Sequence, residues 1–182
     1  SIALVTGANS GLGKAVALKL AQRNWQVVMM CRDRERGEQA RQEIIHLSGN
    51  TNITLLLGDL ANQASIRQAA TDFSRQFDHL NALMNCAGVR MLNRQLTADG
   101  IELMFGAEYL GHFLLSNLLV PALKAGTPST VVTISGEGHK AGVEGGVGAS
   151  MNFEDIQFEK WDVMRASKQV VLAKILFTYE LA

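Results

Sequence analysis

The sequence predicts an α/β protein in which a doubly wound parallel sheet lies between two layers of helices, giving three αβα layers. Short apolar runs, typical of strands buried on both faces, alternate along the chain with longer segments of helical spacing. The first of these runs leads through a glycine turn directly into a helix-prone segment. Such alternation builds right-handed βαβ units, and the expected strand order is 3-2-1-4-5. We therefore expect a ligand at the carboxyl ends of the strands, near the switch between the first and fourth strands.

Five short apolar runs are the predicted strands. They cover residues 2–5, 25–31, 52–57, 80–86 and 130–135. The segments between them carry apolar residues at helical spacing and are the predicted helices. These cover residues 14–22, 34–47, 62–77, a long stretch that opens at 97–100 and ends near 124, and 161–182. Residues 136–150 hold six glycines without strong periodicity, so we expect a mobile loop there.

The composition suits one globular domain with a substantial core. The chain has 182 residues, of which 47% are hydrophobic and 19% charged. Its 17 basic residues balance 17 acidic residues, so the net charge gives no support to nucleic-acid binding. His46, His79 and His112 have no metal-ligand spacing with each other or with the cysteines, so we expect no metal site.

The cysteines and the apolar stretches indicate a location inside the cell. Cys31 and Cys86 each end a predicted strand, and we expect reduced structural thiols rather than a disulfide. The longest apolar stretch, residues 110–123, is interrupted by polar side chains and a proline, so no membrane span is expected. Because the sequence also contains no signal peptide, we expect a cytoplasmic protein, while an anchor before Ser1 stays open.

The glycine turn after the first strand has the geometry of a phosphate site. Gly7, Gly11 and Gly13 turn the chain from a strand into a helix, which directs backbone N–H groups at a phosphate. A bulky residue at Gly7 or Gly11 would push the backbone away from a pyrophosphate, and Gly13 would let the helix pack closely on the strand. The same turn supplies three further candidate cofactor-binding residues, Asn9, Ser10 and Leu12. Its spacing, G-x-x-x-G-x-G, differs from the usual dinucleotide fingerprint. A glycine turn alone can also be a simple connection between a strand and a helix, without a ligand.

With Thr6, these glycines match the signature T-G-x-x-x-G-x-G, and here the chain resembles the short-chain dehydrogenase/reductase family. The resemblance covers the whole chain and implies a Rossmann-like fold and an NAD(P)-dependent oxidoreductase. Residues 30–33, 97–100 and 110–115 look like the branch that holds retinol dehydrogenases, WW-domain oxidoreductase and protochlorophyllide reductase. That branch implies NADP(H) and a small apolar carbonyl or alcohol substrate. The family normally adds two further strands and a substrate-closing segment, so we expect residues 1–182 to be one NAD(P)-binding domain truncated at its C-terminus.

The end of the second strand is where a doubly wound fold distinguishes the two nicotinamide cofactors. An acidic residue there binds the ribose 2′-OH of NAD, whereas an arginine suits the 2′-phosphate of NADP. Arg32 can pair with a phosphate in bidentate fashion, so we favour NADP(H) over NAD(H). Two alternatives stay open. Arg32 could be a solvent-exposed residue of the loop that binds no ligand, and Asp33 could instead form a hydrogen bond with a ribose.

Residues after the third and fourth strands complete the candidate cofactor site. The resemblance places Asp59 and Leu60 at the adenine, although Asp59 could equally cap the next helix. Three further residues, Asn85, Ala87 and Gly88, resemble the family's N-N-A-G, in which Cys86 replaces the second Asn. Ala87 and Gly88 are small enough for backbone to lie against a ribose.

The resemblance also exposes a break in the catalytic pattern. Family members use a tyrosine, four residues before a lysine, to protonate the oxygen of a carbonyl group whose carbon accepts hydride, assisted by a serine and an asparagine. Lys168 matches the lysine, whereas Met164 stands at the tyrosine, Gly136 at the serine and Glu108 at the asparagine. Methionine has no ionisable proton, so it cannot act as acid or base. Of the four positions, only Lys168 carries the residue that the family has there. The resemblance implies that it holds the nicotinamide ribose, although it could also be a solvent-exposed lysine of the helix.

Three functions stay open. The first is an NADP(H)-binding oxidoreductase for a carbonyl/alcohol pair, with weak or absent tyrosine-driven chemistry. The second is a non-catalytic NADP(H)-binding pseudoenzyme that acts as sensor or scaffold and forms a homodimer through the long helix and the last helix. Its interface would use the apolar residues Leu110, Phe113, Leu114, Leu118, Val171, Leu172, Ile175 and Leu176. The third is an active enzyme with altered chemistry, in which His139, Glu137 or Lys140 supplies the missing donor.

Overall fold

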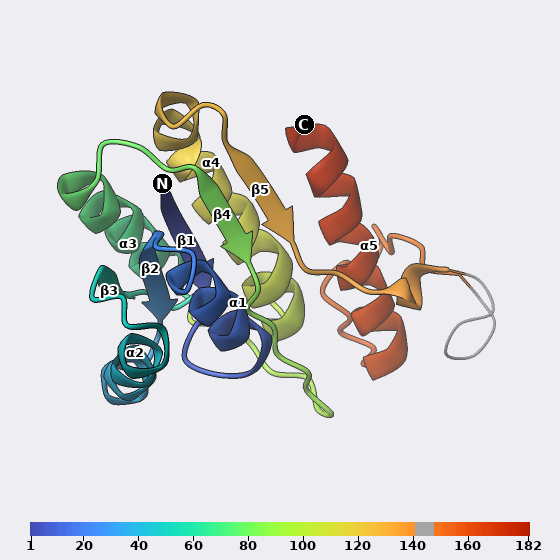
Figure 1. Ribbon diagram of the computed structural model, residues 1–182. Helices are drawn as coiled ribbons and strands as arrows, with labels where there is room; N and C mark the ends of the chain where they lie inside the picture. The colour runs from blue at the N-terminus through green and yellow to red at the C-terminus, as the bar shows by residue number, and fades with distance from the viewer. Residues whose placement is uncertain (141–147) are drawn as a thin grey trace. The chain divides into compact units, whose positions relative to one another are not determined.

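The computed structural model describes residues 1–140 and 148–182, and these form two compact units. The sheet unit comprises residues 1–59, 63–87 and 114–134, and the C-terminal unit comprises residues 60–62, 88–113 and 135–182. Figure 1 shows the chain with its helices and strands labelled.

The sheet unit contains five parallel strands. They are β1 (Ile2–Thr6), β2 (Gln26–Cys31), β3 (Ile53–Leu57), β4 (Ala82–Asn85) and β5 (Thr130–Thr133), in the order β3-β2-β1-β4-β5. This confirms the predicted fold class and strand order. Because β1 lies between β2 and β4, its carboxyl end is the point where the strand order reverses.

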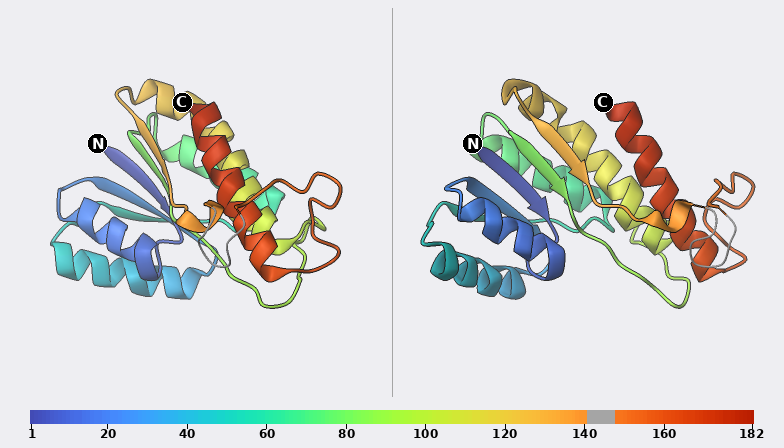
Figure 2. Two further views of the ribbon diagram at one scale, coloured as in Figure 1. Left: turned by 90° about the vertical axis from the view of Figure 1, so that its right-hand side faces the viewer. Right: turned by 45° about the vertical axis from the view of Figure 1, so that its right-hand side comes forward.

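Helices cover both faces of the sheet, as Figures 1 and 2 show. On one face lie α1 (Gly11–Ala21) and α2 (Arg34–Ser48); on the other lie α3 (Gln63–Gln76) and the part of α4 (Gly111–Ala125) that begins at Leu114. Successive strand residues point to opposite faces, so every second residue of β2 belongs to the core under α1 and α2. These are Val27, Met29 and Cys31, which cluster with Ala17 of α1 and Ala40 of α2.

The C-terminal unit is built around α5 (Val163–Leu181), with a π-helix η1 (Phe105–Leu110) and a short 3₁₀ helix η2 (Glu137–His139). Asp162 caps α5, since its carboxylate accepts hydrogen bonds from the N–H groups of Met164 and Arg165. This cap explains why α5 begins two residues later than the predicted start at 161. The core of the unit is apolar and consists of Met104, Phe105, Phe158, Ala166, Val170 and Ala173.

The long helix does not open at residues 97–100, and that prediction is wrong. Gly100 has a φ of +76°, which ends any helical path, and Leu96 pairs with Glu102 in an antiparallel bridge. The helical run begins at Leu103 instead. The buried carboxylate of Glu102 accepts hydrogen bonds from the N–H groups of Met104 and Phe105 (2.9 and 2.8 Å), so it caps this start.

Three smaller expectations concern loops, thiols and the membrane. Residues 141–147 of the predicted mobile loop lie outside the described residues, and within the remainder Glu137–His139 form η2. Cys31 and Cys86 are both free thiols, and burial raises the pKa of Cys31 to about 11. Within residues 1–140 and 148–182, no helix has the length and apolar character that a membrane crossing requires.

Candidate functional site

The glycine turn between β1 and α1 is packed too closely for side chains at two positions. Gly7 has a φ of +65°, and a Cβ there would lie 3.0 Å from Ala87 Cα. A Cβ at Gly13 would lie 2.5 Å from the carbonyl oxygen of Gly7 and 2.9 Å from that of Thr6. Only glycine therefore fits at Gly13, because backbone atoms of the preceding turn occupy the space of a side chain.

Thr6 holds the ends of β1 and β4 together, and sequence reasoning gave it no role beyond the signature. Its buried hydroxyl oxygen accepts hydrogen bonds from the N–H groups of Cys86 and Ala87, both at 3.0 Å. The signal that could have found it is a small hydroxyl residue at the end of a central strand. This arrangement brings Gly7, Gly13 and Ala87 to one edge of the sheet.

The first turn of α1 has features of an anion site and contains no acidic residue of its own, while Glu43 of α2 forms an ion pair with Lys14. Ser10 is the N-cap in an extended conformation, its side chain makes no capping hydrogen bond, and the first turn contains no acidic residue. The first N–H groups of any α-helix have no intrahelical acceptor, and the helix dipole favours an anion beside them. Asn9 is half-buried, while Ser10, Gly11 and Leu12 are exposed. This end of α1 can accept a phosphate.

At the end of β2, Arg32 and Asp33 are exposed but differently engaged. Asp33 is the N-cap of α2, where its Oδ1 accepts a hydrogen bond from the N–H of Arg36 at 2.8 Å. One oxygen of the Asp33 carboxylate is thus already engaged in capping α2, whereas the Arg32 side chain is exposed. After β3, the N–H of Asp59 donates to Ser65 Oγ at 2.9 Å, which fixes the turn into α3.

The candidates that follow β4 divide between the two units. In the sheet unit, the Asn85 side chain is buried and its Nδ2 donates to Ser116 Oγ at 3.2 Å, so its side chain supports the sheet from within. Ala87 lies against Gly7. In the C-terminal unit, Gly88 lies beside the carboxylate of Glu108. Leu60, a candidate that follows β3, belongs to the same unit, and its carbonyl oxygen lies 2.5 Å from the position that a Cβ at Gly111 would take.

The four residues expected at the catalytic positions, Met164, Lys168, Gly136 and Glu108, all belong to the C-terminal unit. Met164 and Lys168 lie one turn apart on α5, and Lys168 is half-buried. Gly136 is extended, and a Cβ there would have no neighbour within 4 Å. The adjacent Ser135 does not replace it, since its Oγ donates to the carbonyl of Val171 at 3.1 Å.

Glu108 and Lys174 form a buried ion pair that sequence reasoning missed. Lys174 Nζ donates to Glu108 Oε2 at 2.9 Å, and their side chains are only 8% and 17% exposed. The available signal was a lysine among the buried residues Val170, Ala173 and Phe177, because a charged side chain on a buried helix face requires a partner.

The proposed substitute donors after Gly136 lie on the surface. His139 Nδ1 donates to the Gly136 carbonyl at 2.8 Å, and Lys140 forms an exposed ion pair with Glu137. The hydrogen bond from Lys140 lowers the pKa of Glu137, so this carboxylate is a weaker proton donor near neutral pH. Glu137 is therefore a poor replacement for a tyrosine, while His139 stays a candidate.

His112 in the C-terminal unit should make the protein less stable in mild acid. Its Nδ1 donates to the Glu108 carbonyl at 2.8 Å, and burial, aided by the Lys174 charge, lowers its pKa to about 4. The unfolded chain, with a histidine pKa near 6.5, then binds more protons between pH 6.5 and 4, so stability falls as the pH decreases through that range. The loss between pH 7 and 5 should be about 2 kcal/mol.

Urea unfolding at both pH values measures this loss. His112→Asn keeps a donor near the position of Nδ1 without a titrating ring, and should remove most of the pH dependence. An equal loss in parent and variant would show that another group is responsible.

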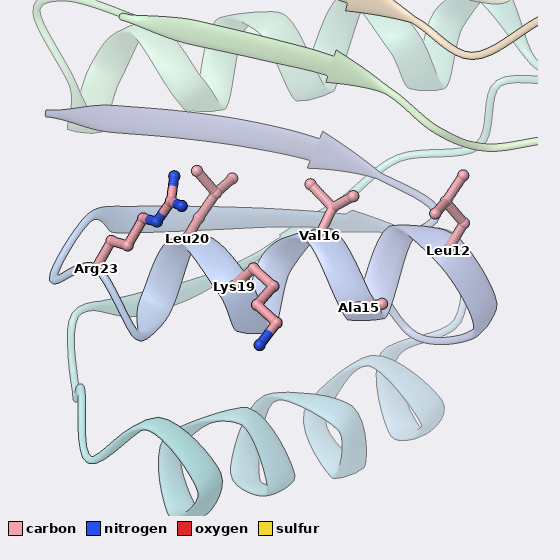
Figure 3. A pocket seen from close by; sticks show the side chains of 6 residues that line it. All are labelled: Leu12, Ala15, Val16, Lys19, Leu20 and Arg23. Carbon is pink, nitrogen blue, oxygen red and sulfur yellow. The ribbon is translucent and has the colours of Figure 1, made fainter.

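A hollow of about 340 Å³ lies along α1 and shares only Leu12 with the glycine turn. Figure 3 shows its lining, which is Leu12, Ala15, Val16, Lys19, Leu20 and Arg23. Because its walls come from α1 and from Arg23 just beyond it, and are mostly apolar, it is not suited to a pyrophosphate. Among the residues that the structure describes, no three His, Cys, Asp or Glu side chains gather to hold a metal ion.

The fold and the glycine turn together define a class of protein. A profile of the short chain dehydrogenase family matches residues 1–162, and the chain belongs to that family. Retinol dehydrogenase 11 of Mus musculus is 43% identical over 182 residues, which cover 100% of this chain and 55% of that protein. Retinol dehydrogenase 13 of Mus musculus is 40% identical over 181 residues, or 98% of this chain and 52% of that protein. The chain thus spans about half the length of the curated relatives it matches, and the expected likeness to retinol dehydrogenases is confirmed.

Solved structures agree with this assignment. A protein of Mycobacterium paratuberculosis is 34% identical and superposes with a TM-score of 0.81, covering 99% of this chain and 60% of its own. A short-chain dehydrogenase of Sphingobium yanoikuyae, solved in complex with NADPH, has a TM-score of 0.74 at 22% identity and covers 99% of this chain and 63% of its own. At that identity the second likeness shows the shared fold.

Proposed function

We propose that the chain binds NADP(H) and that its tyrosine-dependent hydride chemistry is weak or absent. The observation that carries the first half is the glycine turn, where Gly13 has no room for a side chain and α1 opens without an acidic residue. Exposed Arg32 at the end of β2 supports the phosphorylated cofactor. Solved relatives of the same fold that carry NADPH or NADP agree with this proposal.

Each candidate residue has a role in this proposal. The pyrophosphate would lie at the N-terminus of α1, with Arg32 at the 2′-phosphate. Asp59 and Leu60 would contact the adenine, and the residues that follow β4 would support the ribose. Lys168 would hold the nicotinamide ribose. When bound, the cofactor supplies hydride, and the relatives' names suggest an apolar alcohol or its aldehyde as the partner in transfer.

The second half of the proposal rests on the residues that stand at the catalytic positions. Met164 carries no ionisable proton and Gly136 no hydroxyl, and the Glu108 carboxylate is engaged by Lys174. The loss of a positioned general acid alone removes roughly 10²–10⁴-fold of rate. We therefore expect slow turnover at best.

A second candidate function, a non-catalytic sensor or scaffold, is favoured by the same engagement of Glu108. Two large apolar side chains that it would use in a homodimer, Phe113 and Leu176, are 43% and 51% exposed. Sedimentation at several concentrations, together with turnover assays, separates the two functions. A dimer without turnover favours the scaffold, and clear turnover on an aldehyde or alcohol excludes it.

Arg32→Ala tests the cofactor preference and should weaken NADPH binding by about 10- to 100-fold, the value of one charge-assisted phosphate contact. NADH affinity should stay unchanged, because NADH lacks the 2′-phosphate. Titrations that follow nicotinamide fluorescence measure both affinities. Arg23→Ala is the matched control, since Arg23 is exposed and follows the C-terminal end of α1, away from the carboxyl ends of the strands. Equal affinities for NADPH before and after the Arg32 change would refute its role.

A further inference from the structure

The carboxylate of Glu108 connects two segments of the C-terminal unit that are distant in sequence. Its Oε1 accepts a hydrogen bond from the backbone N–H of Val89 at 2.9 Å, and its Oε2 accepts one from Lys174 Nζ, also at 2.9 Å. The same carboxylate lies beside Gly88, where a Cβ would be 3.5 Å from Glu108 Cδ. One partly buried side chain thus ties the segment after β4 to the middle of α5.

The local backbone supports this placement of Glu108. It lies within the π-helix η1, a rare conformation that is frequent at functional sites. The carbonyl of Glu108 accepts a hydrogen bond from the buried ring of His112 at 2.8 Å, which fixes the residue on its backbone side. Both oxygens of the Glu108 carboxylate accept hydrogen bonds and its backbone carbonyl is bonded as well, so the side chain has little rotational freedom.

The chemistry of the pair explains why both charges are needed. A carboxylate removed from water is costly unless it is paired, and a hydrogen bond to a charged group is stronger than one to a neutral group. An asparagine at this position is one methylene shorter than Glu108 and could not reach both partners in the same way. Lys174 supplies the opposite charge, and the carboxylate holds the Val89 N–H and lies beside Gly88.

We propose that the Glu108–Lys174 pair is a positioning device that sets the backbone of Gly88 and Val89 for the nicotinamide end of NADP(H). This rests on the proposed cofactor binding, in which the residues that follow β4 support a ribose and Lys168, which belongs to the same unit as Gly88 and Val89, holds the nicotinamide ribose. We assign neither Glu108 nor Lys174 a contact with the reacting atoms, so both are positioning residues. The pair takes over the place of the asparagine that the family resemblance assigns to a proton relay.

Three substitutions separate charge from shape. Lys174→Met removes the cation at similar volume, Glu108→Gln keeps a carbonyl acceptor for Val89 but removes the charge, and Lys174→Arg restores the cation. Asp72→Asn and Arg75→Met are matched controls, because Asp72 and Arg75 form an exposed ion pair on α3. Such surface pairs contribute little to stability.

The first readout compares two ligands, NADPH and 2′-phospho-ADP-ribose, which lacks the nicotinamide. We expect Lys174→Met and Glu108→Gln each to weaken NADPH binding by about 10-fold, a typical value for a lost charge-assisted contact, and to leave the fragment within about 2-fold. Lys174→Arg should recover most of the NADPH affinity. Equal weakening of both ligands would assign the pair a purely structural role and overturn the proposal, as would no change in either.

The second readout needs no cofactor and keeps the two proposals apart. Hydrogen exchange of the Val89 amide should be at least about 10-fold faster in Lys174→Met than in the parent, with the control variants unchanged. An unchanged exchange rate overturns the positioning role even if the parent binds NADPH. Conversely, a parent that binds neither ligand refutes the proposed function, while faster exchange would still establish that the pair orders this segment.

Discussion

Gly13→Ala should lose NADPH binding by at least about 100-fold and destabilise the fold by about 1–3 kcal/mol. The new Cβ would lie 2.5 Å from the Gly7 carbonyl oxygen and 2.9 Å from the Gly7 carbonyl carbon, and neither atom can move without the turn. The turn would have to open away from α1, which carries the N–H groups proposed to bind the pyrophosphate away from their positions. Fluorescence titration with NADPH and urea unfolding measure the two effects.

Gly49→Ala is the control that separates lost stability from lost binding. Gly49 ends α2 with a φ of +70°, and a Cβ there would meet no atom within 4 Å, so only left-handed strain of about 1–2 kcal/mol is introduced. This variant should be less stable than the parent and bind NADPH normally. If Gly13→Ala bound NADPH as tightly as Gly49→Ala does, the glycine turn would not be the phosphate site.

Introducing a tyrosine and a serine at the proposed catalytic positions should produce the largest gain of function. The double variant Met164→Tyr with Gly136→Ser should raise the rate of NADPH-dependent carbonyl reduction by roughly 10²–10⁴-fold over the parent. A serine side chain has room at Gly136, where a Cβ meets no atom within 4 Å. Arg90 Nη2 lies 3.3 Å from Met164 Sδ, so a cation is already close to the introduced phenol and would favour its ionised form.

Two controls show whether the gain comes from proton transfer. Met164→Phe with Gly136→Ser has the same shape without the phenolic hydroxyl and should stay as slow as the parent. Each single substitution should give only part of the gain, because groups that act as one unit are not additive. A double variant no faster than the parent on a panel of aldehydes and ketones would mean that Met164 and Gly136 are not the tyrosine and serine positions.

Local patterning was enough to predict the sheet, because each strand and each helix of the sheet unit buries its own apolar residues. β1 to β5 follow from apolar runs, and their parallel order follows from the helices between them. The start of the long helix could not be predicted in the same way. It depends on the left-handed Gly100 and on the Glu102 carboxylate, whose buried capping role appears only when the chain is folded.

In the candidate site, too, contacts between residues close in sequence could be predicted, and contacts between distant residues could not. The close packing of Gly13 on the turn before it is local in sequence, so it could be anticipated from glycine spacing, whereas the close approach of Gly7 to Ala87 could not. The link from Thr6 to Ala87 spans 81 positions and the bond from Lys174 to Glu108 spans 66, so neither leaves a local pattern. Long-range polar contacts of this kind depend on the folded backbone and are invisible to periodicity.

The most direct test of the account is a titration of the folded chain, first with NADPH and then with NADH, that follows nicotinamide fluorescence. We expect saturable NADPH binding, clearly weaker NADH binding, and fluorescence that persists when a carbonyl substrate is added, because bound hydride leaves slowly. Absence of binding to either cofactor, in protein shown to be folded by circular dichroism, would contradict it.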